Sequence, residues 1–273
     1  MKSLSTALRV LLAFTDAQQH QSVGGLAQRT GLTKGQVSKI LSTFRSFGLL
    51  QQDPQTRLYS VGIEAFALGS RFVNYHPLCR EALPLVRRLV DRTGHSARLS
   101  VLSERRIIYL LQADGPLLSD TGWRAGMYLP PHATTAGKVA LAFIDEAARE
   151  AMLAEMAMPQ LTPNTVTDKE VLRRQLAEIA KTGYASSRGE STAGLGATSV
   201  PVFAAQNEMV AMLSLAYPEH VVDRKEETKL AAALHEAART LSHRMGSGAY
   251  PFGGRDSEPA PRSAPGKRAR VPA

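Results

Sequence analysis

The sequence of 273 residues is poor in cysteine, with only Cys79. One cysteine excludes an internal disulfide and a metal cluster built on cysteine ligands. No apolar run reaches the ~18–20 residues that a membrane-spanning helix needs. The first ten residues form an amphipathic pattern without a cleavage site after it, so they are not a signal peptide. These absences predict a cytoplasmic protein with no membrane partner.

Patterns that carry catalysis are missing as well. Gly137-Lys138 has His132 where a phosphate-binding loop needs its first glycine, and Val139 follows the lysine. No Gly-x-Ser-x-Gly elbow is present, and the seven histidines show no metal-ligand spacing. We therefore expect no catalytic residue, no metal site and no cofactor. An enzyme with a vestigial DNA-binding module is kept as a rival, which turnover of any stabilising ligand would revive.

Negative charge is scarce at the two ends of the chain, which has a net charge of +9. Residues 1–76 hold eight Lys/Arg against three acids, and residues 246–273 hold five against two. The middle is close to neutral. A basic head on a neutral body is typical of a polyanion binder with a separate second task.

Residues 22–60 have the pattern of two short helices, a turn and a hairpin. Ser22 and Thr33 stand where helix N-caps belong. Gly31 lies between them and suits the left-handed conformation of a tight turn. After the second helix, runs at 49–52 and 57–61 flank a turn at Asp53-Pro54, which predicts a wing.

The second helix has one apolar and one polar face. Its apolar positions follow the i, i+3, i+4, i+7 spacing of a buried stripe: Val37, Ile40, Leu41 and Phe44. In a helix-turn-helix this helix enters the major groove, where Lys and Gln can contact guanine and adenine edges. A helical hairpin with a solvated polar face is the plainer alternative. The residues expected to face DNA are Thr33, Lys34, Gln36, Ser38, Lys39 and Ser42, with Arg45 and Arg57 on phosphates.

The chain divides into four parts by composition and pattern. We predict a winged helix-turn-helix at 1–62, a linker helix at 63–76 that could also be a dimer contact, a mixed α/β domain at 77–245 and a disordered basic tail at 246–273. The tail is rich in Gly, Pro, Ser and Arg and has almost no aliphatic residues. It either is simply solvated or adds non-specific phosphate contacts. The fold class is α+β.

Four stretches in this order resemble the IclR family of bacterial transcriptional regulators: the leading helix at 3–14, the reader at 26–50, the run LPPHATTAGKVALA at 129–142, and the stretch from Gly183 to Val202. The resemblance covers about residues 4–245. It implies a winged helix-turn-helix, a linker helix and a GAF-like domain that binds a small organic ligand, often a carboxylate. It also implies a homodimer or dimer of dimers on a near-palindromic operator in double-stranded DNA.

Several positions depart from the family pattern. Gly35 stands where the family has a small residue such as Ser or Ala, and a glycine inside a helix costs about 1 kcal/mol. This suggests a recognition helix that becomes firmer on DNA. Lys39 replaces a common arginine, so a bidentate contact there is disfavoured. Ala197 replaces a frequent cysteine, and Ser187 and Arg188 fill a region where an acid is common. Ligand identity therefore cannot be copied from relatives.

The effector site is expected where the two late strands face the loop at 123–132. An organic acid would favour an arginine for bidentate pairing, or the backbone amides at the helix start near Thr135. Each residue also has a structural alternative: a surface charge for Arg188, strand packing for the hydroxyls, and support of the Pro-Pro turn for His132. The candidate polar residues are His132, Arg188, Thr198, Ser199 and Ser214, with Trp123, Met127 and Leu129 as apolar wall.

The function that these features predict is sequence-specific transcriptional regulation controlled by a small organic, carboxylate-type metabolite. The main alternative is a constitutive DNA-binding protein whose C-terminal domain serves only oligomerisation. A ligand that stabilises the protein saturably would separate the two.

Overall fold

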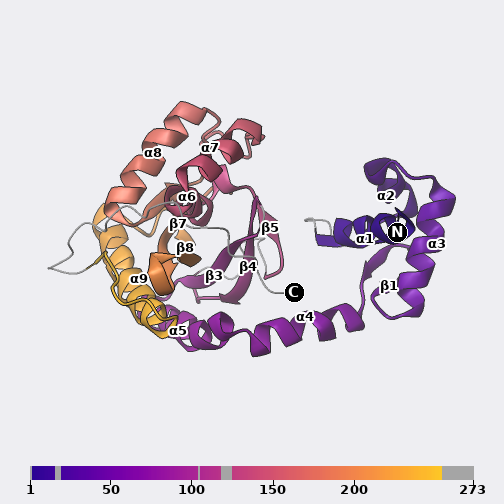
Figure 1. Cartoon of the computed structure of the whole chain (residues 1–273), viewed down its shortest axis with the longest axis horizontal. Coiled ribbons are helices and arrows are strands. Elements are labelled where there is room, and N and C mark those ends of the chain that lie inside the picture. The colour runs from indigo at the N-terminus through magenta and orange to yellow at the C-terminus, as the bar shows by residue number, and fades with distance from the viewer. Residues whose placement is uncertain (1, 16–19, 104, 118–124, 254–273) are drawn as a thin grey trace. The chain divides into compact units, whose positions relative to one another are not determined.

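The structure, a computed structural model, describes residues 2–15, 20–103, 105–117 and 125–253 (Figure 1). The chain forms two compact units, one comprising residues 1–76 together with Gly126–Tyr128 and the other comprising the remainder. We call them the reader unit and the body unit. Among the described residues, none of the helices combines the length and apolarity needed to cross a membrane.

The reader unit is built from short helices and a two-stranded wing. Ser22 accepts a hydrogen bond from the Gly25 amide at the start of α2, and Gly31 ends that helix with φ 69°. Both features confirm the predicted turn chemistry. The elements are α1 (Lys2–Leu12), η1 (Ala13–Thr15), α2 (Val23–Thr30), α3 (Lys34–Ser46), β1 (Leu50–Gln52), β2 (Tyr59–Val61) and α4 (Ile63–Tyr75).

One apolar cluster fixes the reader helices against the wing. In α3 the predicted stripe is confirmed, with Val37 and Leu41 buried and Ile40 and Phe44 half-buried. The wing pairs Leu50 with Val61 in an antiparallel ladder. The cluster comprises Val10, Phe14, Leu26, Ala27, Val37, Leu41, Leu50 and Tyr59.

The body unit is a six-stranded sheet with helices on both faces. The strand order is β5-β4-β3-β8-β7-β6, and β3–β4, β3–β8, β7–β8 and β6–β7 pair antiparallel. This arrangement confirms the predicted α+β class with a GAF-like domain. The strands are β3 (Ser96–Ser103), β4 (Arg106–Ala113), β5 (Tyr128–Leu129), β6 (Ala185–Arg188), β7 (Leu195–Phe203) and β8 (Met209–Pro218).

Helices cover the two faces of this sheet differently. Helices α5 and α9 pack together on one face, while α6 lies on the other and is backed by α8 (Figure 1). Because α6 is enclosed between sheet and helix, it is apolar almost all round. The helical elements are α5 (Pro77–Thr93), η2 (Pro131–Ala133), α6 (Thr135–Phe143), α7 (Glu146–Glu155), α8 (Lys169–Thr182), η3 (Ala205–Asn207) and α9 (Arg224–Arg244).

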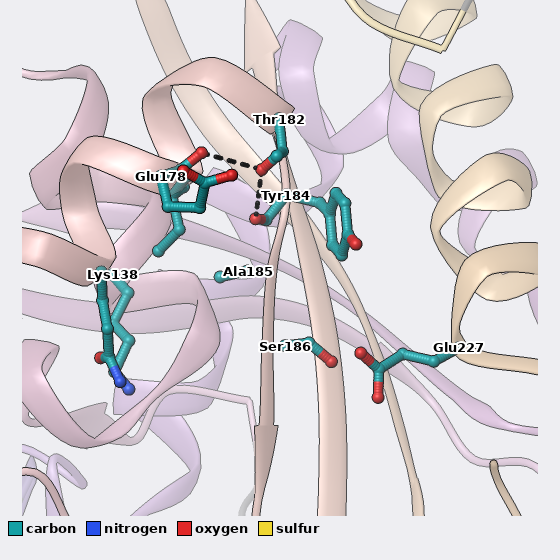
Figure 2. Close-up of a pocket in the computed structure, with 9 residues that line it drawn as sticks. Lys138, Glu178, Thr182, Tyr184, Ala185, Ser186 and Glu227 are labelled. Carbon is teal, nitrogen blue, oxygen red and sulfur yellow. Dashed lines mark hydrogen bonds between the residues drawn. The ribbon is translucent and has the colours of Figure 1, made fainter. Parts of the chain in front are cut away.

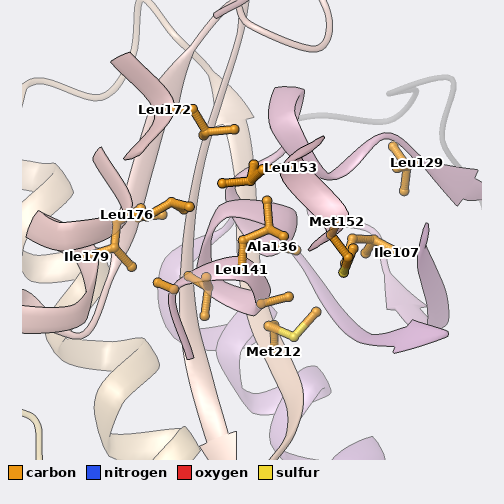
Figure 3. Packing of buried hydrophobic residues seen from close by; sticks show 14 of the residues in the cluster. Ile107, Leu129, Ala136, Leu141, Met152, Leu153, Leu172, Leu176, Ile179 and Met212 are labelled. Atoms are coloured by element: carbon orange, nitrogen blue, oxygen red, sulfur yellow. The ribbon is translucent and has the colours of Figure 1, made fainter. Parts of the chain in front are cut away.

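Figure 3 shows the main apolar cluster of the body unit. It joins Met212 of the sheet to Leu141 of α6 and Leu176 of α8, each of them at most 3% exposed. Further members come from β4, β5 and α7. This cluster holds α6 rigidly over the sheet, so the N-terminus of α6 has a fixed place above the strands.

Residues 246–253 differ from the prediction of a disordered tail. The Tyr250 hydroxyl lies 2.9 Å from Nδ1 of His235 and donates to the Pro201 carbonyl at 3.1 Å. The Phe252 ring lies so close to Gly183 (φ 78°) that a β-carbon at Gly183 would be 2.2 Å from it. Two aromatic rings supply the burial that the average composition of the segment hides. Residues 254–273, the rest of the predicted tail, lie outside the described residues.

Candidate functional site

The outer face of α3 presents the predicted DNA-facing residues to solvent. Thr33, Lys34 and Gln36 lie in its first turn, and all three are exposed. The remaining members of the set are also exposed: Ser38, Lys39, Ser42, Arg45 and Arg57. The polar face therefore meets the steric requirement for lying in a major groove.

The first turn of α3 contains a capping box. The Thr33 hydroxyl accepts from the Gln36 amide at 3.3 Å, and Gln36 Oε1 accepts from the Thr33 amide at 3.0 Å. The Thr33 hydroxyl also donates to Gln36 Oε1 at 3.0 Å. A bidentate contact from Gln36 to adenine would need its oxygen to leave this cap, whereas a contact through its amide donors would not.

The two predicted phosphate contacts are linked through the wing. Arg45 donates to Gln52 Oε1 at 2.9 Å, and Gln52 Nε2 donates to the Arg57 carbonyl at 3.0 Å. Arg57 adopts φ 60° at the end of the turn. The end of α3 and the tip of the wing therefore form one connected polar surface.

In the body unit, a polar row crosses the middle of the sheet. Arg98 of β3 stands opposite Ser214 of β8, and Ser214 stands opposite Ser199 of β7. Ser199 Oγ lies 2.6 Å from Ser214 Oγ and 2.6 Å from Thr135 Oγ1. Directly opposite residues share a sheet face, so the row faces α6 and ends at its first turn.

Arg98 is the residue of this row that sequence reasoning missed. It is 4% exposed, and its guanidinium lies 5.1 Å from the centre of the Tyr109 ring. Arginine is rarely so buried without electron-rich partners. A signal was present, because an arginine interrupts the otherwise uncharged strand 96–103. Its alignment with Ser199 and Ser214 required the strand register.

The other predicted effector residues fall into separate groups. Leu129 lies in the cluster that contains Tyr109 and Ala136, and Met127 is half-buried. Trp123 lies outside the described residues. Thr198 contacts the Tyr217 hydroxyl at 2.9 Å and, one residue from Ser199, faces the opposite side of the sheet.

Arg188 and His132 are engaged elsewhere. Arg188 is exposed and donates to the carbonyls of Glu219 and Val222 at 3.0 and 2.7 Å. His132 is fully buried, and its Nε2 lies 3.0 Å from the Pro159 carbonyl. Burial lowers the pKa of His132, so its neutral ring can donate to Pro159. That bond supports the structural alternative for His132.

A buried ion pair joins two of the stretches that carry the family resemblance. Lys138 Nζ donates to both carboxylate oxygens of Glu190 at 2.7 Å, with side chains 3% and 10% exposed. Burial lowers the pKa of Lys138, and the Glu190 charge opposes that shift. Thr165 donates to the Glu190 carbonyl at 2.7 Å. The pair anchors α6 to the segment after β6.

Comparison with known families agrees with this architecture. Residues 3–54 match the IclR helix-turn-helix domain, and residues 70–243 match the family described as bacterial transcriptional regulator IclR C-terminal. The second match alone spans more than half of the chain.

The chain belongs to the IclR family.

Curated relatives of this IclR-family protein are transcriptional regulators and not enzymes. It is 32% identical over 220 residues to the regulator BhcR of Paracoccus denitrificans, covering 81% of this chain and 79% of that protein. It is 28% identical over 246 residues to XynR of Escherichia coli, covering 90% and 98%. It is 30% identical to KdgR of Dickeya chrysanthemi, covering 92% and 83%.

Solved structures show the same fold over nearly their whole length. An IclR transcriptional regulator from Alicyclobacillus acidocaldarius superposes with a TM-score of 0.79 at 30% identity, covering 90% of this chain and 99% of that one. An IclR homologue from Microbacterium hydrocarbonoxydans, complexed with 4-hydroxybenzoate, gives 0.72 at 24% identity, covering 89% and 98%. At that identity the second likeness shows the fold alone.

Proposed function

We propose that this IclR-family regulator binds a specific operator in the cytoplasm through α3 and releases or retains it in response to a small organic acid held over the polar row of the body unit. The carrying observation is the row itself. It brings Arg98, two serine hydroxyls and the start of α6 together in the interior of the body unit. Ligand sites are mostly apolar, with a few converging polar groups of this kind.

For DNA, the exposed first turn of α3 supports major-groove contacts. Lys34 and Lys39 would pair with guanine edges or phosphates, and Arg45 and Arg57 with the backbone. Positioning by phosphates and discrimination by base edges are separate roles, so the two arginines set register while the α3 face selects sequence.

Two helices of the reader unit support assembly with a second copy. On α4, Ile63, Phe66 and Leu68 are 70%, 67% and 69% exposed, although they are large and apolar. Large apolar side chains exposed in this way favour a protein partner. A twofold pair of readers would match a near-palindromic operator. The α1 residues of the same kind are Leu4, Leu8 and Leu12.

The chemistry of the row favours a carboxylate as effector. A guanidinium pairs with a carboxylate through two parallel hydrogen bonds, and low exposure strengthens them. The amides in the first turn of a helix and its dipole also favour an anion near Thr135. We assign Arg98, rather than Arg188, as the residue that holds the acid group. The 4-hydroxybenzoate of the Microbacterium homologue is an acid of this class.

Coupling between the two units follows from thermodynamic linkage. The acid can change operator affinity only by the difference in its affinity for two arrangements of the dimer. Because Thr135 bonds to the row, a ligand held there acts first on the junction between α6 and the sheet.

The DNA half of the proposal is tested by fluorescence anisotropy. The full-length protein is titrated onto duplex DNA from its own upstream region and onto a scrambled duplex, at several salt concentrations. Binding at least ~10³-fold tighter to the native duplex, with a steep salt slope, is expected. Equal affinity for both, with or without added acids, would refute specific binding to that region.

The effector half is tested by thermal shift with matched acids and amides, beginning with 4-hydroxybenzoate and 4-hydroxybenzamide. An acid that binds should raise the melting temperature saturably, and its amide should not. Arg98→Gln should abolish the shift, while Arg92→Gln on the exposed part of α5 should leave it unchanged. A shift that survives Arg98→Gln would refute the assignment of Arg98.

A further inference from the structure

A hollow lies at the free edge of the sheet, separate from the polar row. It is a groove of about 270 Å³ between α8, β6 and α9 (Figure 2). Strand β6 is the last in the sheet order and lies three positions from β3, which carries Arg98. Figure 2 shows Glu178 on one side of β6 and Tyr184 and Glu227 on the other.

The main chain of β6 leaves hydrogen-bonding groups facing this groove. Gly189 N–H donates to the Leu195 carbonyl, so these two residues form a hydrogen-bonded pair that continues the β6–β7 ladder. Alternation along an antiparallel ladder then turns the amide and carbonyl of Ser186 away from β7 and toward the edge. The adjacent outward carbonyls already accept bonds, Tyr184 from Thr182 and Arg188 from Asn164. Between them, the outward amide and carbonyl of Ser186 have no hydrogen-bond partner among the described residues.

Two buried side-chain oxygens at the groove have no hydrogen-bond partner among the described residues. They are Gln175 Oε1 and Ser186 Oγ. Leaving a buried polar group unpaired is unfavourable, so each oxygen marks a place where a partner is missing. Figure 2 shows the Ser186 hydroxyl and the Glu227 carboxylate directed toward one another. A donor placed between them would bond to both.

The charges around the groove determine what kind of donor fits. Lys138 lies at its inner end, but both Glu190 oxygens already bind its ammonium group. Within the described part of the chain, Glu178 has one distant ion-pair partner, Lys181 at 3.7 Å. Glu227 keeps one oxygen beside the groove, because Arg188 contacts only the other at 3.3 Å. The groove therefore offers acceptors and carboxylates, with the Tyr184 ring beside them.

We propose that this groove binds a guanidinium or primary ammonium group. Its N–H donors would satisfy Ser186 Oγ and pair with Glu227, while the Tyr184 ring adds a cation–π face. Ser186 main-chain groups would bond to the amide or polar atoms next to the cation. An anion would meet the negative charge of Glu178 and Glu227, and an apolar ligand would leave Ser186 Oγ unpaired.

Two sources carry such a group. One is a free amine. The other is the basic segment at 254–273, which has Arg255, Arg262, Lys267, Arg268 and Arg270. That segment follows Gly253, whose β-carbon position lies 2.5 Å from His235, and the His235 ring lies 6.3 Å from that of Tyr184. The chain thus leaves the described region beside the groove.

Agmatine, which carries one guanidinium and one primary amine, is the probe. Its binding is measured by isothermal titration on the full-length protein and on a full-length variant with those five basic residues changed to Gln. Saturable binding to both would identify a free amine as the occupant. Binding to the second protein alone would identify the segment at 254–273. No binding to either would overturn the proposal.

Two variants test the position of the site. Glu227→Gln and Ser186→Ala, in whichever protein binds agmatine, should each weaken binding at least tenfold. Glu226→Gln is the matched control, because Glu226 is the next residue on α9 but pairs with Lys229 at 2.8 Å. Equal affinity in Glu227→Gln and Glu226→Gln would also overturn the proposal. None of these results depends on DNA or on acid binding at Arg98.

Discussion

The two units place their proposed functional side chains in opposite ways. In the reader unit every predicted DNA-facing residue is exposed, and a few local contacts such as the capping box position them. In the body unit Arg98, Ser199 and Ser214 are at most 5% exposed and come together from three strands. Most of the proposed DNA-facing residues thus lie outside the core of the reader, whereas the proposed ligand-binding groups of the body are also part of its interior.

The largest loss of stability should come from breaking the buried ion pair of the body unit. Glu190→Ala leaves the Lys138 ammonium buried without its partner, so the free energy of unfolding of the body should fall by about 3–5 kcal/mol. Urea denaturation measures it. Glu236→Ala, in a pair with Arg92 whose side chains are 52% and 63% exposed, should cost under ~1 kcal/mol. Similar losses would show that burial does not distinguish these pairs.

Burial of His235 should also make the stability of the body unit depend on pH. Burial lowers the pKa of His235 from 6.5 to about 4. The unfolded chain therefore binds more protons than the folded one between these values, so stability falls as pH drops through that window, by roughly 3 kcal/mol at most. Urea titrations at pH 7 and pH 4.5 measure it. His235→Gln should flatten this slope, and a slope matching that of exposed His243→Gln would contradict the burial argument.

The stability of the reader unit should change less, and only when a substitution alters local helix structure. Thr33→Ala removes the cap of α3 and should lower the stability of the reader by about 1 kcal/mol. Gly35→Ala should raise it by up to about 1 kcal/mol, because a β-carbon there meets nothing within 4 Å. Thermal unfolding measures both. Two changes of the same sign would contradict the helical environment assigned to Gly35.

The smallest stability effect belongs to the charges of α3. Lys34→Ala and Lys39→Ala should alter stability by less than ~0.5 kcal/mol, since both side chains are exposed. Each should lower the slope of log affinity against log salt by about one unit per lost phosphate contact. Anisotropy titrations on operator DNA give the slope. An unchanged slope in both variants would remove α3 from the DNA interface.

Sequence reasoning was most successful where the relevant contacts are close along the chain. The caps at Ser22 and Thr33 and the turn at Gly31 involve residues within four positions of one another, so residue type is sufficient to predict them. The sequence also indicates Ser199 and Ser214, which lie in the polar row. It wrongly assigns Thr198 to the same face as Ser199. Consecutive strand residues face opposite sides, and only the observed ladder assigns each to a face.

The sequence by itself determined the order of the parts, the local form of the reader and the membership of the family, because those depend on residue type, spacing and charge. Tertiary structure alone decided that Arg98, and not Arg188, lies in the interior row, and that Tyr250 and Phe252 pack against the body. It also brought Lys138 and Glu190 together as a buried ion pair. The physical reason is register: contacts between distant segments depend on which residues of two paired strands stand opposite, and no local property of either segment specifies that.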